Sequence, residues 1–447
     1  MLMLDLALQH SAMKFLNEIS SVFPAAISFA AGRPTERVFD KLRPDVLMQM
    51  LRTYESHASS DGCLLAETRS HLLQYGRTAG IITELVSRQL YLDEGVPASS
   101  DRMLITAGCQ EAIALCLSAL CSDPRDVVLV CNPTYIGVTG AANAGRVALL
   151  ALPNTRNDIA ESIDEAVCAL QLAGRRARAL YIVPDFDNPT GRVLDESQRR
   201  SILAACGRHQ IVILEDNAYG LFRYEGQPVR PLAALDEIGC VIYLSTFSKT
   251  LSPALRVGAA TLPNNLFGDR AASQALWEDL VNRKSFLTVN TSQIAQAMVA
   301  EVLLEQDGTL LNWIQPALAR YRENRDLTLT HLQAVFSPLS NDVRWNRPSG
   351  GFFLMVDLPF KFDAESVNEC ASQNGVIVAP MSFFAFDNSQ DYRIRLAFSV
   401  VEPEQIQAGI SSLGRYVARR LARPPRFGDG RRNASDQVSQ SLPATDL

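Results

Sequence analysis

Short apolar runs alternate with amphipathic stretches through the middle of the chain, between about residues 60 and 290. Each run is four or five residues long and is bounded by polar or turn-forming positions, which is typical of a strand buried on both faces. Strands that alternate with helices form mainly parallel sheets covered on both sides. The pattern predicts an α/β fold with a mainly parallel seven-stranded sheet, and we expect its strands at residues 103–106, 127–131, 147–151, 179–183, 211–215, 241–245 and 259–262.

The pattern changes on both sides of this region and indicates further units. A helical run of apolar residues stops at Pro24, and long helical stretches follow the last predicted strand from 277 to 325. Beyond them, short strands and helices up to about residue 420 predict a smaller α+β domain. We therefore expect an N-terminal arm with an extended segment at 1–40, a large cofactor-binding domain at 41–300, the small domain at 301–421 and a disordered tail at 422–447.

Composition and charge exclude several classes of protein. The chain has 447 residues, 47% of them hydrophobic, and a net charge of −6, which argues against binding to nucleic acid through clustered cations. No stretch approaches the roughly 20 apolar residues of a membrane span, and the N-terminus does not resemble a signal peptide. The nine cysteines are scattered and form no Cys-x-x-Cys pair. We therefore expect no metal site, no disulfide framework and a cytoplasmic location.

The most informative segment lies at the end of the sixth predicted strand. Lys249 closes the sequence Ser-Thr-Phe-Ser-Lys, with hydroxyls at Thr246 and Ser248, and Arg256 follows within one short loop. Burial and a nearby cation lower the pKa of a lysine and so favour its uncharged amine, the form that Schiff-base chemistry needs. The hydroxyls and the arginine are together suited to a phosphate group. The alternative is an exposed lysine at a strand end, flanked by ordinary polar turn residues.

Three other segments combine a predicted strand with polar or glycine residues at its end. Residues 181–191 form a strand followed by Asn-Pro-Thr-Gly, residues 211–219 form a strand that ends in acidic and phenolic groups, and residues 104–111 form a strand, a glycine turn and a helix start. The order of these motifs along the chain is the order seen in the class I/II aminotransferases, fold-type I enzymes that use pyridoxal 5′-phosphate, and the chain resembles this family over about residues 13–420. Residues 15–24, 26–34 and 380–384 are similar to the group of 2-aminoadipate and kynurenine aminotransferases and to dihydroxyphenylglycine transaminase.

The resemblance implies roles for residues around the cofactor ring. Lys249 would be the catalytic lysine that bonds to the cofactor, and Asp216 would hold the proton on the pyridine nitrogen. Tyr219 and Asn188 would hydrogen-bond the 3′ oxygen, and Tyr135 would stack on the ring. As ordinary structural residues, Asp216 would be a turn or cap residue and Tyr135 a core tyrosine.

The resemblance also implies a phosphate site. A helix N-terminus offers free N–H groups and a favourable dipole to an anion. We expect the phosphate at the start of the helix after the first predicted strand. Cys109 stands where relatives often have a small hydroxyl or alanine, so backbone amides would do more of the binding there. The expected phosphate-binding residues are Gly108, Cys109, Gln110, Thr246, Ser248 and Arg256, with Tyr75 supplied by a neighbouring subunit. A shared tyrosine implies a homodimer with shared active sites.

Substrate binding is expected to depend on Arg395, because its planar fork matches a carboxylate. Arg393 lies on the same face of the strand but does not precede the Leu-Ala-Phe-Ser sequence of the family pattern. Gly32 and Arg33 lie in a segment that covers the substrate in relatives, with Asn188 beside it, and Arg33 could bind a polar side chain or simply face solvent. Met381 replaces the more usual glycine and would narrow the substrate pocket.

These expectations favour an aminotransferase that moves an amino group between an amino acid and a 2-oxo acid. The resemblance suggests an aromatic or arylglycine-type substrate in specialised metabolism. The same cofactor site could instead serve decarboxylation, oxidation, elimination or replacement. Related domains also occur in transcription regulators, but the similarity begins near Met13, and we therefore expect no winged helix before it.

Overall fold

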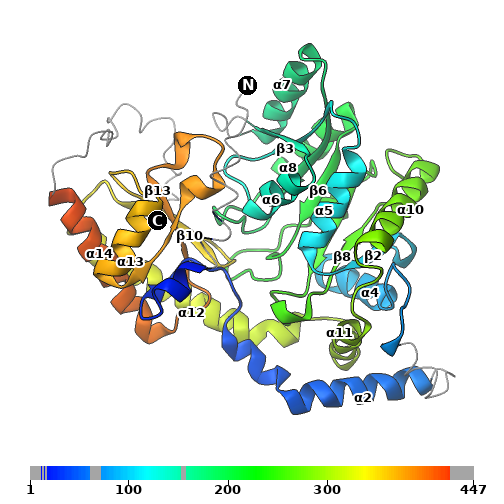
Figure 1. The fold of residues 1–447 in the computed structure, drawn as a ribbon, viewed down its shortest axis with the longest axis horizontal. Helices are drawn as coiled ribbons and strands as arrows, with labels where there is room; N and C mark the ends of the chain where they lie inside the picture. Colours follow the sequence, from blue (N-terminus) through cyan, green and yellow to red (C-terminus); the bar gives the residue numbers. More distant parts are fainter. Residues whose placement is uncertain (1–11, 13–14, 16–17, 61–71, 153–157, 423–447) are drawn as a thin grey trace.

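The computed structural model describes residues 12, 15, 18–60, 72–152 and 158–422. Its central element is a seven-stranded sheet in the order β2-β8-β7-β6-β5-β3-β4 (Figure 1). Only β8 runs antiparallel to its neighbours β2 and β7; the other pairs are parallel. All seven predicted strands are present, as Met103–Thr106, Asp126–Val130, Ala148–Ala151, Arg176–Ile182, Val212–Asp216, Val241–Thr246 and Gly258–Thr261 for β2 to β8.

Helices cover both faces of this sheet, as the continuous apolar strands predict. Alternate residues of β5 show the two sides: Tyr181 packs with one core cluster and Leu180 with another. The first cluster includes helices α5 (Cys109–Leu120), α6 (Ile136–Ala144) and α10 (Arg270–Leu287). The second includes α7 (Ile159–Leu172), α8 (Glu196–His209) and α9 (Leu232–Leu235). The α/β fold is confirmed.

Four more helices lie beside this domain or lead out of it. Helix α11 (Gln293–Glu305) packs against α2 (Pro44–Ser60) and α4 (Thr83–Glu94), and α12 (Leu311–Phe336) continues into the small domain (Figure 1). The predicted boundary between residues 300 and 301 falls within α11, and the division into domains stays a prediction. Most of the predicted tail, and the first eleven residues of the arm, lie outside the described residues.

The small domain is built on an antiparallel sheet with the order β12-β13-β10-β9, and α13 (Ala364–Asn374), α12 and α14 (Pro403–Ala422) pack around it. Its strands are Ala379–Pro380, Arg393–Ala397, Phe353–Asp357 and Arg344–Trp345, in that order across the sheet. The N-terminal segment joins this domain through β1 (Ile27–Ser28), which pairs in parallel with β11 (Val376–Ile377). This pairing carries the following residues, including Gly32 and Arg33, toward the large sheet.

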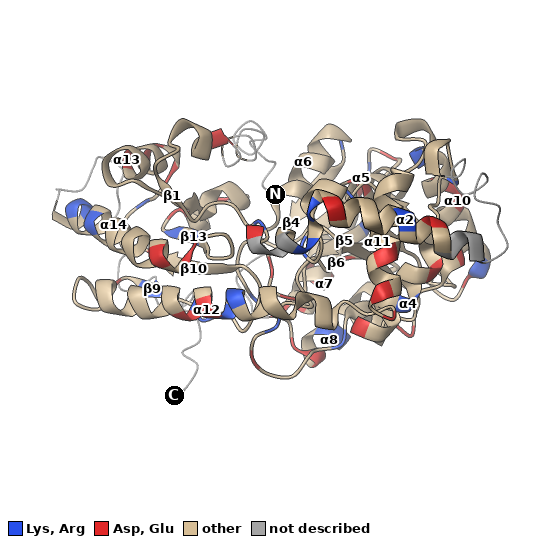
Figure 2. Cartoon of the chain, turned by 90° about the horizontal axis from the view of Figure 1, so that it is seen from below, with Lys and Arg blue, Asp and Glu red and all other residues tan. Residues whose placement is uncertain are grey.

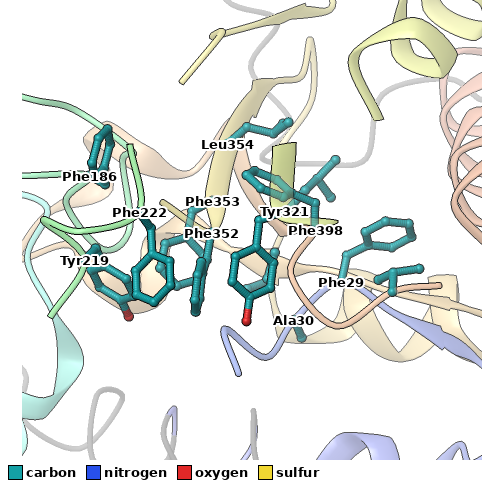
Figure 3. Close-up of a cluster of buried hydrophobic side chains, with 14 of the residues drawn as sticks. Phe29, Ala30, Phe186, Tyr219, Phe222, Tyr321, Phe352, Phe353, Leu354 and Phe398 are labelled. Atoms are coloured by element: carbon teal, nitrogen blue, oxygen red, sulfur yellow. The ribbon is translucent and has the colours of Figure 1, made fainter. Parts of the chain in front are cut away.

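An aromatic cluster connects the two domains beneath the cavity described below. Tyr219, from the loop after β6, packs edge-on against Phe353 of β10 with ring centroids 5.6 Å apart. Phe352 contacts Phe222 of the same loop and Tyr321 of α12 at 5.1 and 4.6 Å (Figure 3). Because these rings are buried, they fix the loop that follows β6 relative to the small domain.

Candidate active site

A cavity of about 290 Å³ lies where the ends of the large-domain strands meet the small domain and the N-terminal segment. Ligands of open α/β sheets bind outside the carboxyl ends of the strands, and β5, β6 and β7 all end here. Thirteen of the fifteen predicted site residues line the cavity: Gly32, Arg33, Cys109, Gln110, Tyr135, Asn188, Asp216, Tyr219, Thr246, Ser248, Lys249, Arg256 and Arg395. Gly108 adjoins it, and Tyr75 lies outside.

Lys249 projects into this cavity from the turn after β7. Its Nζ donates a hydrogen bond to the carbonyl oxygen of Gly32 at 3.0 Å. Burial lowers the pKa of Lys249 to about 8; the negative charge of Asp216 opposes this shift, and the cations Arg256, Arg395 and Arg33 add to it. The lowered pKa makes the uncharged amine far more accessible near neutral pH than in an exposed lysine, as a nucleophilic lysine requires.

Asp216, the last residue of β6, places its carboxylate in the depth of the cavity between two donors. The hydroxyl of Tyr181 donates to Oδ2 at 2.6 Å, and the thiol of Cys109 donates to Oδ1 at 3.4 Å. Burial raises the pKa of Asp216, while these hydrogen bonds and Lys249 oppose that rise. Its neighbour Glu215 points to the opposite face, as strand alternation predicts, and accepts the N–H groups of Leu232 and Ala233 in α9.

Tyr181 is a site residue that the sequence did not reveal. It lies within an apolar strand and is fully buried, so its position is typical of a core residue. A buried phenol normally finds a hydrogen-bond partner, and here the partner is a site carboxylate on the adjacent strand. The sequence does contain a tyrosine in the strand that precedes the Asp216 strand. Its role can be recognised only when the pairing of β5 with β6 is known.

The turn between β2 and α5 forms a cradle with Arg256. The guanidinium of Arg256 donates to Ser248 Oγ at 3.2 Å through Nη1 and to the Ala107 carbonyl at 3.1 Å through Nη2. Thr246 Oγ1 lies 3.0 Å from Ser248 Oγ. Gly108 has φ 78°, and a Cβ there would lie 2.3 Å from Arg256 Nη2, so a glycine is needed for both conformation and space. Hydroxyls, a cation and a helix N-terminus thus converge as a phosphate dianion requires.

Arg395 reaches the opposite side of the cavity from β13. Its Nη1 donates to Asn188 Oδ1 at 2.6 Å, and its Nη2 donates to the Ala30 carbonyl. The guanidinium lies 4.5 and 4.6 Å from the ring centres of Phe353 and Phe384. Burial lowers the pKa of Arg395 to about 10. Arg393 on the same strand instead forms an ion pair with Asp357.

The remaining predicted residues divide between the cavity wall and the surface. Tyr135 lines the wall, and Gln110 holds the start of α6 by donating from Nε2 to the Gly137 carbonyl at 2.7 Å. Arg33 is exposed at the cavity edge, and its guanidinium forms no ion pair with any described residue. Tyr75 is 83% exposed and makes no contribution to the cavity of its own chain.

The expectation for Met381 is wrong. Met381 is fully buried in the small-domain core and does not line the cavity. It begins a short 3₁₀ helix, Met381–Phe384, that turns the chain so that Phe384 reaches the cavity. The aromatic residue three positions later therefore takes the place that we had assigned to the methionine.

The donor set fits pyridoxal phosphate. A lysine amine, a deep carboxylate, a wall tyrosine and the cradle at Arg256 face one cavity, each suited to a different part of that cofactor. Residues 57–413 match the family model of aminotransferase class I and II. The chain belongs to this family. It is a pyridoxal-phosphate-dependent aminotransferase that acts on an amino acid and a 2-oxo acid.

Individual relatives agree with this assignment along nearly their whole length. The aminotransferase is 38% identical over 418 residues to (S)-3,5-dihydroxyphenylglycine transaminase of Amycolatopsis orientalis, covering 93% of each chain. It is 28% identical over 395 residues to aromatic-amino-acid aminotransferase 1 of Thermococcus litoralis, covering 88% of each. The crystal structure of Pyrococcus horikoshii kynurenine aminotransferase superimposes with a TM-score of 0.77 at 26% identity, covering 91% of this chain and 95% of that one.

No helix among the described residues combines the length and the apolar character that a membrane span requires. The described part of the chain also contains no group of three or more His, Cys, Asp or Glu suited to a metal ion. In the view of Figure 2, acidic and basic residues are interspersed along the helices rather than separated by sign.

Proposed function

We propose that this aminotransferase takes an aromatic or arylglycine-type amino acid as its donor. The observation that carries the proposal is the aromatic wall around Arg395, formed by Phe353 and Phe384. A flat apolar side chain would pack well there while the α-carboxylate binds the arginine. The 38% identity to a dihydroxyphenylglycine transaminase supports the same class of donor. Arg33 lies at the cavity edge without an acidic partner among the described residues, and it would bind hydroxyl groups on the ring.

In this proposal each residue of the cavity has a separate role in binding or in proton transfer. Pyridoxal phosphate, when bound, supplies an electron sink conjugated with the substrate's α-carbon. Arg395 binds and orients the α-carboxylate, exchanging its present contacts with Asn188 and Ala30 for the substrate. Lys249 would hold the cofactor through its amine, and the same amine would move the proton that leaves the substrate's α-carbon. Asp216 would hold the proton on the ring nitrogen, and Tyr219 and Asn188 would hydrogen-bond the 3′ oxygen.

A panel of donors tests the substrate proposal. We expect kcat/KM for 3,5-dihydroxyphenylglycine and phenylalanine to exceed that for alanine and glutamate, measured with one fixed 2-oxo acid. Arg395→Lys should raise KM for every donor by about ten- to a hundredfold, because a charge-assisted pair contributes roughly 1.5–3 kcal/mol. Arg33→Ala should change the order of the donors more than the overall rate.

Two results of this panel would contradict the assignments. A preference for alanine or glutamate in the wild-type enzyme would exclude the aromatic donor. A uniform loss for Arg33→Ala together with a selective loss for Arg395→Lys would show that the two arginines have the opposite roles. Arg393→Lys is the matched control, since that arginine lies on the same strand but binds Asp357.

We also propose that the active unit is a homodimer in which Tyr75 reaches the phosphate site of the partner. Tyr75 and its neighbour Leu73 are 83% and 74% exposed, and Phe286 and Leu287 at the end of α10 are 83% and 65% exposed. Large exposed apolar residues are expected where a partner subunit binds, and we assign these four to that surface. The Tyr75 loop is held near that surface by Gln293, whose Nε2 donates to the Gln74 carbonyl at 2.6 Å.

Mixing two damaged subunits tests the shared site. Lys249→Ala and Tyr75→Phe subunits each give impaired homodimers, but a heterodimer contains one site with both residues intact. Activity after subunit exchange should therefore rise above that of either parent. The exchange itself is followed with two affinity tags. Full exchange without recovered activity would show that Tyr75 serves its own chain or no site at all.

A further inference from the structure

The phosphate cradle is held from behind by a carboxylate that does not line the cavity. Glu111, in the first turn of α5, accepts the backbone N–H of Ala107 on Oε2 at 2.6 Å. The carbonyl oxygen of Ala107 accepts a hydrogen bond from Arg256 at 3.1 Å. Ala107 is thus held on both sides, by Glu111 behind the turn and by Arg256 in front of it. Gly108, whose φ of 78° shapes the cradle, follows directly.

Glu111 is itself held by the end of α10, 173 residues away in the sequence. The fully buried Lys284 donates from Nζ to Glu111 Oε2 at 2.9 Å and to Thr288 Oγ1 at 2.8 Å. The hydroxyl of Thr288 in turn donates to Glu111 Oε1 at 2.7 Å. The three side chains form a closed triangle of hydrogen bonds, in which each side chain contacts the other two. Such networks fix geometry strongly when they are complete.

The same part of the chain also holds the strand that leads into the cradle. Thr291, between α10 and α11, donates from Oγ1 to the Ile105 carbonyl of β2 at 3.0 Å. Gln296 of α11 accepts the N–H of Ile81 at 2.8 Å and donates to the Thr291 carbonyl at 2.8 Å. The turn from β2 to α5 is therefore fixed at both of its ends by one segment, residues 284–296.

We propose that Glu111, Lys284 and Thr288 are positioning residues that fix the turn at residues 106–109 in the conformation that binds the cofactor's phosphate. The inference rests on the phosphate site proposed above. It also explains why a lysine is buried at this point. A lone carboxylate at the N-terminus of α5 would compete with a phosphate dianion for the helix dipole, and Lys284 neutralises it at close range.

Binding of two forms of the cofactor to the apo-protein tests this role. Pyridoxal phosphate uses the cradle and pyridoxal, which lacks the phosphate, does not. Fluorescence titration of Glu111→Gln and Thr288→Val should show affinity for pyridoxal phosphate reduced about tenfold or more, the size expected for a lost hydrogen bond to a charged group. Affinity for pyridoxal should stay unchanged. Thr288 is exposed, so its variant should fold normally.

Charge and geometry predict opposite results for one of these variants. If Glu111 acted only through its charge, Glu111→Gln would leave an extra cation near the phosphate, and affinity for pyridoxal phosphate would rise. If it positions the turn, affinity falls in Glu111→Gln and also in Lys284→Met. A rise or no change in both Glu111→Gln and Thr288→Val would overturn the proposal, and so would an equal loss for pyridoxal.

Two further variants distinguish failure of the positioning role from failure of the proposed phosphate site. Glu369→Gln removes another carboxylate of equal burial, which is 3.7 Å from Arg420 in the small domain, and should leave the ratio of the two affinities unchanged. Arg256→Met should abolish the preference for the phosphorylated form. If Arg256→Met keeps that preference, the phosphate site itself is wrong. If Arg256→Met loses it while the Glu111 and Thr288 variants do not, only the positioning role fails.

Discussion

Replacing Lys249 by alanine is expected to abolish amino transfer, with a loss of at least roughly 10⁴-fold in kcat. Proton transfer by a positioned side chain alone contributes about 10²–10⁴-fold, and the same nitrogen is proposed to hold the cofactor. No other described lysine lines the cavity. The loss is measured as single-turnover conversion of the bound cofactor by a donor amino acid, and it should exceed that of any variant at Arg33 or Arg395.

Chemical tagging identifies the lysine independently of activity. Borohydride should fix the cofactor to one peptide, the one containing Lys249, out of a chain whose lysines are Lys14, Lys41, Lys249, Lys284 and Lys361. Lys284 is the comparison because it is fully buried and its amine is paired with Glu111. Recombination of the apo-protein with pyridoxal phosphate should accelerate as pH rises, with a midpoint near the lowered pKa of about 8. A tag on any other lysine would overturn the assignment.

The large sheet could be predicted from sequence because its strands are buried on both faces. Runs such as Val-Val-Leu-Val at 127–130 contain no alternating polar residues, which indicates burial on both faces. The amphipathic stretches between these runs indicate where the helices lie. The order along the chain does not give the order in space, however. Strand β8 returns to lie between β2 and β7, and this places the Arg256 loop against the start of α5.

The candidate site was predictable where one residue type has a clear chemical use at a strand end. Lys249, Asp216 and Arg395 are of this kind, and the structure brings all three to one cavity. Contacts that depend on the pairing of distant elements were not predictable. The Tyr181 hydroxyl finds Asp216 only because β5 and β6 are neighbours, and Glu111 finds Lys284 only because α10 packs on α5.

The Met381 error has a different cause. The sequence identified the correct turn, but the consequence of a substitution there depends on which way each side chain faces. Met381 and Phe384 are three positions apart and so lie on the same side of the 3₁₀ helix, but Met381 packs in the core and only Phe384 lines the cavity. Phe384, which lies 4.6 Å from the Arg395 guanidinium, faces the cavity.

Asp216→Asn is expected to reduce kcat on the order of a thousandfold, about 4 kcal/mol of barrier. Asparagine keeps the shape and an acceptor for Tyr181 but loses the charge that is proposed to hold the proton on the ring nitrogen. KM for the donor should change little, because Arg395 and its surroundings are untouched. Tyr181→Phe keeps the charge and removes one hydrogen bond, so its loss should be smaller, roughly tenfold.

Stability of the apo-protein provides the control for this variant. Burial raises the pKa of Asp216 above its ordinary value, so the folded protein binds this proton more tightly than the unfolded chain. Ionisation of this group therefore costs folding free energy, and its contribution to stability falls as pH rises from the unfolded pKa through the folded one. At neutral pH the Asn variant avoids that cost, and its apo-form should melt no lower than the wild-type apo-form. A large drop in melting temperature would attribute the lost activity to unfolding.

A charged cofactor analogue separates the role of Asp216 from other effects of the substitution. Pyridoxal phosphate methylated on its ring nitrogen carries a permanent positive charge and needs no carboxylate to keep it. Reconstitution with this analogue should restore a large part of the lost kcat in Asp216→Asn and should give Lys249→Ala no activity. Near wild-type turnover of the Asn variant with the ordinary cofactor would show that the carboxylate does not hold the ring proton, and failure of the methylated analogue to help would point to Asp216 acting on geometry instead.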